Sequence, residues 1–139
     1  MSIPASAHGR FTGQKQLYLE PGADAIVCDA EFDVSAEAIK YRWSYKDKPQ
    51  EGSISLTGEG ASYHDTWHQS TPATATSVDV GGALVAVSLR YAEEGDTAWV
   101  WRIVLSQRPS GEVVLQMFNK TPWGEDGLAV NIVGTPASD

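Results

Sequence analysis

Glycine and proline recur along this chain at nearly regular intervals and divide it into short segments. The 139 residues include 13 glycines and 7 prolines, and the segments between them are about 6–11 residues long, the length of a β-strand. We therefore expect ten strands, at Arg10–Leu19, Asp24–Val34, Ala38–Lys46, Gln50–Thr57, Ala61–Gln69, Ala73–Val80, Ala83–Ala92, Thr97–Gln107, Glu112–Asn119 and Gly127–Val133.

Within these segments the side chains alternate with a period of two. In residues 39–46, apolar or aromatic side chains alternate with polar or charged ones, and residues 63–68 and 99–105 also divide into two alternating sets. Successive side chains on a strand point to opposite faces, so each set lines one face of a sheet. The one short stretch with helical character, Ser35–Ala38, is too short to matter.

Short strands joined by tight turns predict an antiparallel sheet, because parallel strands need long crossover connections. Gly81-Gly82 is a hairpin signal of this kind. We expect an all-β fold, a single antiparallel up-and-down barrel of about ten strands, with a two-sheet sandwich as the alternative. The barrel occupies residues 10–135, between tails at 1–9 and 136–139. Ten strands also predict a central cavity, since eight already enclose room for one small ligand.

The charge balance excludes several classes of partner. Ten Lys and Arg against eighteen Asp and Glu give a net charge of −8, which argues against nucleic acid and against an anionic membrane surface. Cys28 is the single cysteine, so no internal disulfide forms. The first residues carry neither a basic nor an apolar signal region, and we expect a cytoplasmic protein.

Aromatic residues are the main candidates for a binding site. Trp43, Trp67, Trp99 and Trp101 all fall in the middle of expected strands, where they either pack in the core or line a pocket for an apolar ligand. The candidate ligand-binding wall is Tyr41, Trp43, Tyr63, Asp65, Trp67, Trp99, Trp101, Arg102 and Asn119.

Two arginines within apolar strands, Arg42 and Arg102, are candidate polar anchors. An inward-facing arginine must meet a carboxylate, either Asp65 or one carried by a ligand. An outward-facing arginine is a solvated surface charge. The sequence leaves both orientations open.

Other chemistry-bearing residues do not form a recognisable site. His64 and His68 share a strand face but lie roughly 13 Å apart, too far to bind one metal ion. An acid–base pair of Asp65 and His68 would need a β-bulge. Cys28 has no cation or histidine near it on its strand face and reads as a core residue. We expect no metal and no cofactor.

Several segments together resemble a bacterial family of unknown function with a calycin-type barrel, similar in architecture to lipocalins and fatty-acid-binding proteins. They are Trp43–Gly52, Asp65–His68, Trp99–Arg102 and Asn119–Glu125, with Gly9–Gly13 similar to a G-x-W-x-G start in which Phe11 replaces the tryptophan. The resemblance spans Phe11 to Val133 and implies a barrel with a central cavity but no particular reaction. Haem-binding barrels of the nitrobindin type are similar in size, but their axial histidine motif has no counterpart here.

Three functions follow as hypotheses. The leading one is a non-enzymatic protein that holds a small, mainly apolar or amphipathic ligand, which could carry a carboxylate, inside the barrel. The second is an enzyme with Asp65 or a histidine as general base and Arg102 as electrostatic stabiliser. The third is a homodimeric interaction module, for which Trp123 is the expected exposed residue.

Overall fold

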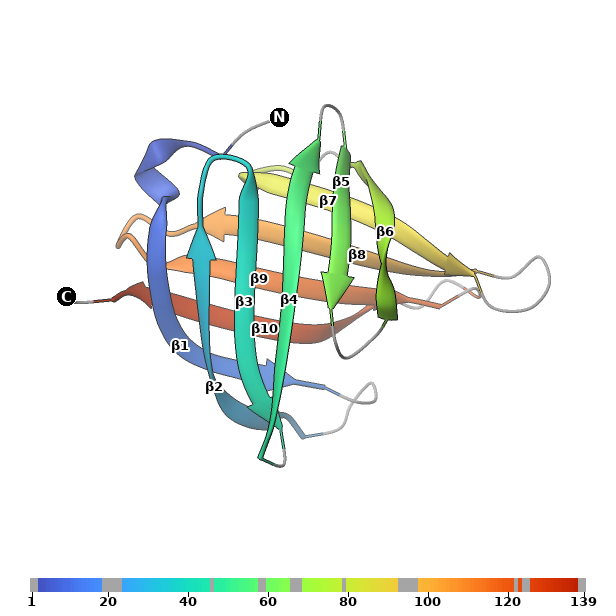
Figure 1. The fold of residues 1–139 in the computed structure, drawn as a ribbon, viewed down its shortest axis with the longest axis horizontal. Helices are drawn as coiled ribbons and strands as arrows, with labels where there is room; N and C mark the ends of the chain where they lie inside the picture. Colours follow the sequence, from blue (N-terminus) through green and yellow to red (C-terminus); the bar gives the residue numbers. More distant parts are fainter. Residues whose placement is uncertain are drawn as a thin grey trace.

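Ten strands form one sheet that closes on itself in a computed structural model of the chain (Figure 1). The structure describes residues 3–18, 24–45, 47–57, 60–65, 69–78, 80–92, 98–121, 123 and 126–137. A 3₁₀ turn, η1 (Ala5–Ala7), precedes the strands. They are β1 (Gly9–Leu17), β2 (Ile26–Val34), β3 (Ala38–Tyr45), β4 (Lys48–Thr57), β5 (Gly60–Asp65), β6 (Gln69–Ser77), β7 (Val85–Ala92), β8 (Ala98–Gln107), β9 (Val113–Lys120) and β10 (Asp126–Pro136).

The strand order confirms the expected antiparallel up-and-down barrel. Each strand pairs with its neighbours in sequence, and β1 pairs with β10 to close the ring. Figure 1 shows β2 to β5 running across β8 to β10, so that the two sides of the barrel face each other. No described helix is long and apolar enough to span a membrane.

The β6–β7 seam is much shorter than the others. Two residue pairs join these strands, Thr76↔Ser88 and Ser77↔Val87, whereas each of the other seams has five to nine. One further bond, from the Val78 amide to the Ala86 carbonyl (2.9 Å), lies beyond them. Over most of their length, β6 and β7 therefore make no ladder with each other.

The N-terminal segment closes one end of the barrel, where β1 begins. Ile3 and Ala7, which the sequence pattern assigns to a tail, belong to the buried core. The Ile3 amide donates to the carbonyl of Ala36 (2.8 Å), which lies in the β2–β3 turn. The side chain of Gln107, the last residue of β8, donates to the Ser6 carbonyl (3.0 Å). We call the interior next to this segment the η1 half and the remainder, towards the end of β1, the distal half.

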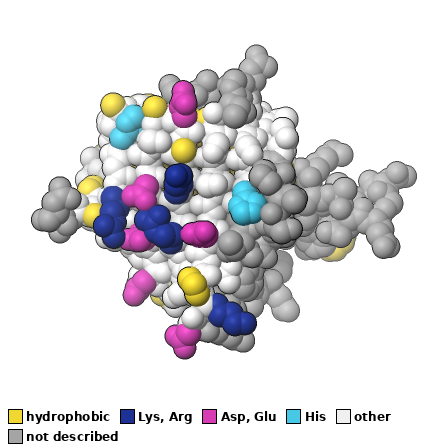
Figure 2. Space-filling view, in the orientation of Figure 1, with side chains coloured by type: hydrophobic (Ala, Val, Ile, Leu, Met, Phe, Trp, Pro, Cys, Tyr) yellow, Lys and Arg dark blue, Asp and Glu magenta, His cyan; other side chains and the backbone are white. Residues whose placement is uncertain are grey.

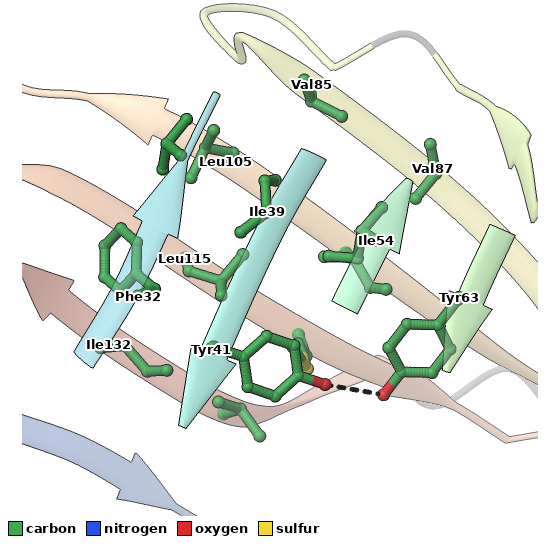
Figure 3. Close-up of a cluster of buried hydrophobic side chains, with 14 of the residues drawn as sticks. Phe32, Ile39, Tyr41, Ile54, Tyr63, Val85, Val87, Leu105, Leu115 and Ile132 are labelled. Carbon is green, nitrogen blue, oxygen red and sulfur yellow. Dashed lines mark hydrogen bonds between the residues drawn. The ribbon is translucent and has the colours of Figure 1, made fainter. Parts of the chain in front are cut away.

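Apolar side chains fill the η1 half. Figure 3 shows buried apolar side chains of β2 to β4 on one side of the interior and those of β7 to β10 on the other. Phe11 and Phe32 stack with ring centroids 5.2 Å apart. The fully buried aliphatic members include Ile39, Ile54, Val87, Leu105 and Leu115. The described part of this half is a packed core.

Candidate functional site

The distal half of the interior carries polar groups as well as aromatic rings. Tyr41 on β3 and Tyr63 on β5 are both buried, and their hydroxyls lie 3.2 Å apart in a hydrogen bond (Figure 3). Both residues belong to the expected wall, and both are buried inside the barrel. A tyrosine pair of this kind can exchange its mutual bond for one to a ligand.

Lys15 on β1 is the polar interior residue that the sequence reasoning missed. Its side chain is only 3% exposed, and Nζ lies 2.9 Å from the centroid of the Trp43 ring. Trp43, an expected wall residue, is likewise buried. A desolvated ammonium over an indole face gains about 2 kcal/mol from the ring quadrupole. The contact therefore holds a cation against the aromatic wall.

Trp101 and Asn119 complete the described part of the expected wall. Trp101 on β8 is buried between Leu89 and Asn119, its register partners on β7 and β9. Asn119 is half-buried. Asp65 and Trp99 lie in β5 and β8, but their side chains lie outside the described residues.

Trp67 and His68 also lie outside the described residues. The acid–base and metal hypotheses that involve His68 are therefore not tested by this geometry. His64 alternates with the buried Tyr63 on β5 and faces the outside of the barrel. Among the described residues, no group of three His, Cys, Asp or Glu side chains could hold a metal ion.

Arg102 does not line the interior, which corrects one member of the expected wall. It alternates with the buried Trp101 and Ile103 and points outward, where Nη2 lies 3.0 Å from Oδ2 of Asp126. Its guanidinium carbon also lies 4.6 Å from the Phe118 ring centroid. Arg102 therefore cannot anchor a ligand inside the barrel in this arrangement.

Arg42 is also an outer residue and belongs to a charged network. It bonds Glu31 (2.8 Å) and Asp33 (2.8 Å), and Arg10 bonds Glu31 (2.6 Å). Figure 2 shows Lys and Arg side chains interleaved with Asp and Glu on this face. Hydrogen bonds from Arg42 and then Arg10 lower the pKa of the Glu31 carboxyl. Both candidate arginine anchors thus turn out to be surface charges.

A hollow lies on the outside of the barrel, over β1 to β4. It encloses about 900 Å³ between outward side chains such as Gln14, Glu31 and Glu51. A smaller hollow of about 270 Å³ adjoins it over β3 to β5, next to His64. The walls of the larger hollow combine carboxylates with Arg42, which already bonds Glu31 and Asp33. They therefore favour no particular class of ligand.

Cys28 faces inward on β2, as expected for a core residue, but the expectation that no cation lies near it is wrong. It lies directly opposite Lys15 in the β1–β2 ladder. Burial raises the pKa of the Cys28 thiol, the Lys15 ammonium lowers it by a smaller amount, and Asp29 contributes a further small increase. The thiol is therefore protonated at neutral pH.

The alternation of β1 could have revealed Lys15. Phe11, Gly13 and Leu17 lie at the same parity as Lys15, and the opposite parity carries Thr12, Gln14 and Gln16. A lysine on the apolar parity of a strand is buried when that parity faces the core.

The prediction that Trp123 is exposed is confirmed, since its exposed fraction is 68%.

The fold and its interior define a ten-stranded up-and-down β-barrel with a cation buried against its aromatic wall. The chain matches no model of a known protein family, and no curated protein is similar to it in sequence.

Proposed function

We propose that this protein binds a small, mainly apolar molecule in the distal half of the barrel interior. The observation that carries the proposal is the inward cluster of Lys15, Trp43, Tyr41 and Tyr63. Binding pockets combine apolar and aromatic walls with a few polar groups that orient the ligand. The resemblance to calycin-type barrels, which hold ligands in their interiors, points in the same direction.

The polarity of this cluster supports binding over simple packing. Polar groups buried in a core cost free energy unless they are hydrogen-bonded, and a charged group costs several kcal/mol. The described part of the η1 half is filled by apolar side chains. The buried polar groups of the distal half therefore distinguish it from the apolar η1 half, and they are suited to orienting a ligand.

The experiment uses N-phenyl-1-naphthylamine, a neutral apolar dye that fluoresces when shielded from water. Wild-type protein should bind it saturably with one dye per chain. Asn119→Phe places an aromatic ring at a half-buried position of β9 next to Trp101 and should abolish binding. Lys120→Phe adds the same ring one residue further along, on an exposed position of the opposite parity, and should leave binding intact.

Two results would contradict this proposal. One is the absence of saturable dye binding to the folded wild-type protein. The other is equal binding by Asn119→Phe and wild type, since the dye would then occupy a different place such as the outer hollow. Circular dichroism confirms that each variant is folded.

The exposed Trp123 favours a homodimer as a second candidate function. Large exposed aromatic side chains are typical of interaction surfaces. Sedimentation of wild type and Trp123→Ser tests it: a dimer that the substitution converts to monomer is expected, and a monomeric wild type rejects it.

A further inference from the structure

Two neighbouring rows of side chains on the outside of the barrel carry no charge. They cross β8, β9, β10 and β1, and their members alternate along each strand with residues that pack in the core. The first row is Val104, Gln116, Asn131 and Gln16, with Val27 of β2 at its end, and the second row is Ser106, Val114, Val133 and Gln14. We call these residues the neutral face.

A ladder of side-chain amides runs through the middle of the neutral face. Nε2 of Gln116 donates to Oδ1 of Asn131 (3.1 Å), and Nδ2 of Asn131 donates to Oε1 of Gln16 (3.1 Å). All three residues are half-buried, and these bonds hold their amides in a line across β9, β10 and β1. An amide carries two N–H donors and an oxygen with two lone pairs. The ladder uses only some of them, so it can also bond a partner.

Two large apolar side chains are exposed among the described residues, and both belong to the strands of this face or to their connections. Val27, which is 53% exposed, is the register partner of Gln16. Trp123, which is 68% exposed, lies in the turn that joins β9 to β10. The centre of a protein–protein interface is depleted of charged residues, and interfaces are enriched in aromatic ones. The neutral face and its flanks share this composition.

The chemistry of the neutral face fits a second copy of this chain. In a twofold dimer, a residue near the axis meets its own copy. A charged side chain there would meet a like charge, whereas an amide both donates and accepts and can bond an identical amide. Two copies with a net charge of −8 repel each other. Contact through the neutral face keeps the charged outer face of β2 to β4 (Figure 2), which includes Glu31 and Arg42, away from the interface.

We propose that two copies of this protein associate through their neutral faces, with the twofold axis close to Asn131 at the centre of the amide ladder. This inference rests on the homodimer that the exposed Trp123 favours and adds the surface through which it forms. It is independent of ligand binding inside the barrel.

Sedimentation velocity of the full chain at several concentrations measures the dissociation constant of the dimer. Asn131→Lys places a lysine opposite its own copy and should raise this constant by about a hundredfold, because like charges would face each other across the interface. The substitution also reduces the net negative charge, which by itself would weaken the repulsion between copies. Ser55→Lys makes the same change of charge at an exposed, outward position of β4 and should leave the dimer intact.

A mixture of two variants tests the symmetry. Asn131→Asp alone should dissociate the dimer as Asn131→Lys does. An equimolar mixture of the two variants should restore it, because opposite charges then meet close to the axis. Circular dichroism confirms that each variant is folded. If Asn131→Lys and Asn131→Asp do not fold, Val133→Lys and Val133→Asp, at the next outward position of β10, replace them.

The outcomes separate this inference from the others. A wild type that stays monomeric overturns both the homodimer and its interface, and it leaves the ligand-binding proposal standing. A dimer that Trp123→Ser dissociates and Asn131→Lys does not leaves the homodimer standing and overturns the neutral face as its interface. Equal dissociation by Asn131→Lys and Ser55→Lys also overturns it, as does a mixture of folded Lys and Asp variants that stays monomeric.

Discussion

Gly134 on β10 occupies a place where the core leaves no room for a side chain. A Cβ at this position would lie 2.6 Å from Cζ of Phe32 and 2.7 Å from Cβ of Phe11, whereas carbon atoms in contact are about 3.5–4.0 Å apart. Phe32 is fully buried and stacks on Phe11, so its ring cannot move without displacing other core residues. Gly134→Ala must therefore strain the core.

Overpacking of this kind costs about 2 kcal/mol, and the reduced freedom of the unfolded chain offsets at most about 1 kcal/mol of it. The free energy of unfolding should fall by about 1–2 kcal/mol. For a domain of this size that corresponds to a decrease of roughly 3–7 °C in Tm. Thermal unfolding followed by circular dichroism measures this directly.

Gly127→Ala is the matched control on the same strand. A Cβ at Gly127 meets no atom within 4 Å, and its backbone is outside the left-handed region. This substitution should leave Tm unchanged or raise it slightly. The reasoning is refuted if Gly134→Ala melts as high as Gly127→Ala, because the two aromatic rings would then yield without cost.

Three further predictions concern single side chains. The pKa of Glu31 is lowered in the folded protein, so its ion pairs stabilise the protein fully above the ordinary glutamate pKa. That contribution is lost as the pH falls through the lowered pKa. The Tm difference between wild type and Glu31→Gln should therefore be constant near neutrality and vanish in strong acid. The raised pKa of Cys28 predicts slow alkylation by iodoacetamide in mildly alkaline buffer, slower still in Lys15→Met and rapid after denaturation; equal rates in folded and denatured protein would contradict this. Tyr41→Phe should cost about 1 kcal/mol of stability, and the Tyr41→Phe/Tyr63→Phe double variant should cost less than the sum of the single changes, whereas strict additivity would mean that the hydroxyls do not interact.

Strand number and pairing could be predicted from the sequence because the positions of glycine and proline and the alternation of side chains along each strand are local signals. Each of the ten expected segments overlaps the corresponding observed strand, and Ala61–Gln69 also reaches the first residue of β6. The main difference is around Pro72, expected to separate two strands but found inside β6. Proline is tolerated where a strand makes no ladder bond, and this part of β6 does not pair with β7.

Orientation could be predicted only where one parity was clearly polar. Tyr41, Trp43 and Tyr63 alternate along their strands with polar residues, and all three are buried. Arg102 remained ambiguous because Val100 and Val104, of its own parity, are as apolar as those of the opposite parity. Lys15 was missed because a lysine is ordinarily exposed, and nothing local indicates that the Trp43 ring lies beneath it in the folded barrel.

Because the β6–β7 seam is short, the barrel resembles a single curved sheet whose two edge strands, β6 and β7, are joined by only a few residue pairs. From β7 through β10 and then from β1 to β6 the sheet is continuous, and its middle is the β1–β10 seam with seven residue pairs. Opening the seam breaks two residue pairs and the Val78–Ala86 backbone bond, and it leaves every other described ladder intact. Among the described seams, this one therefore has the fewest backbone pairs to break. Amide hydrogens of β6 and β7 should exchange with solvent by this local opening, well before those of β1 and β10.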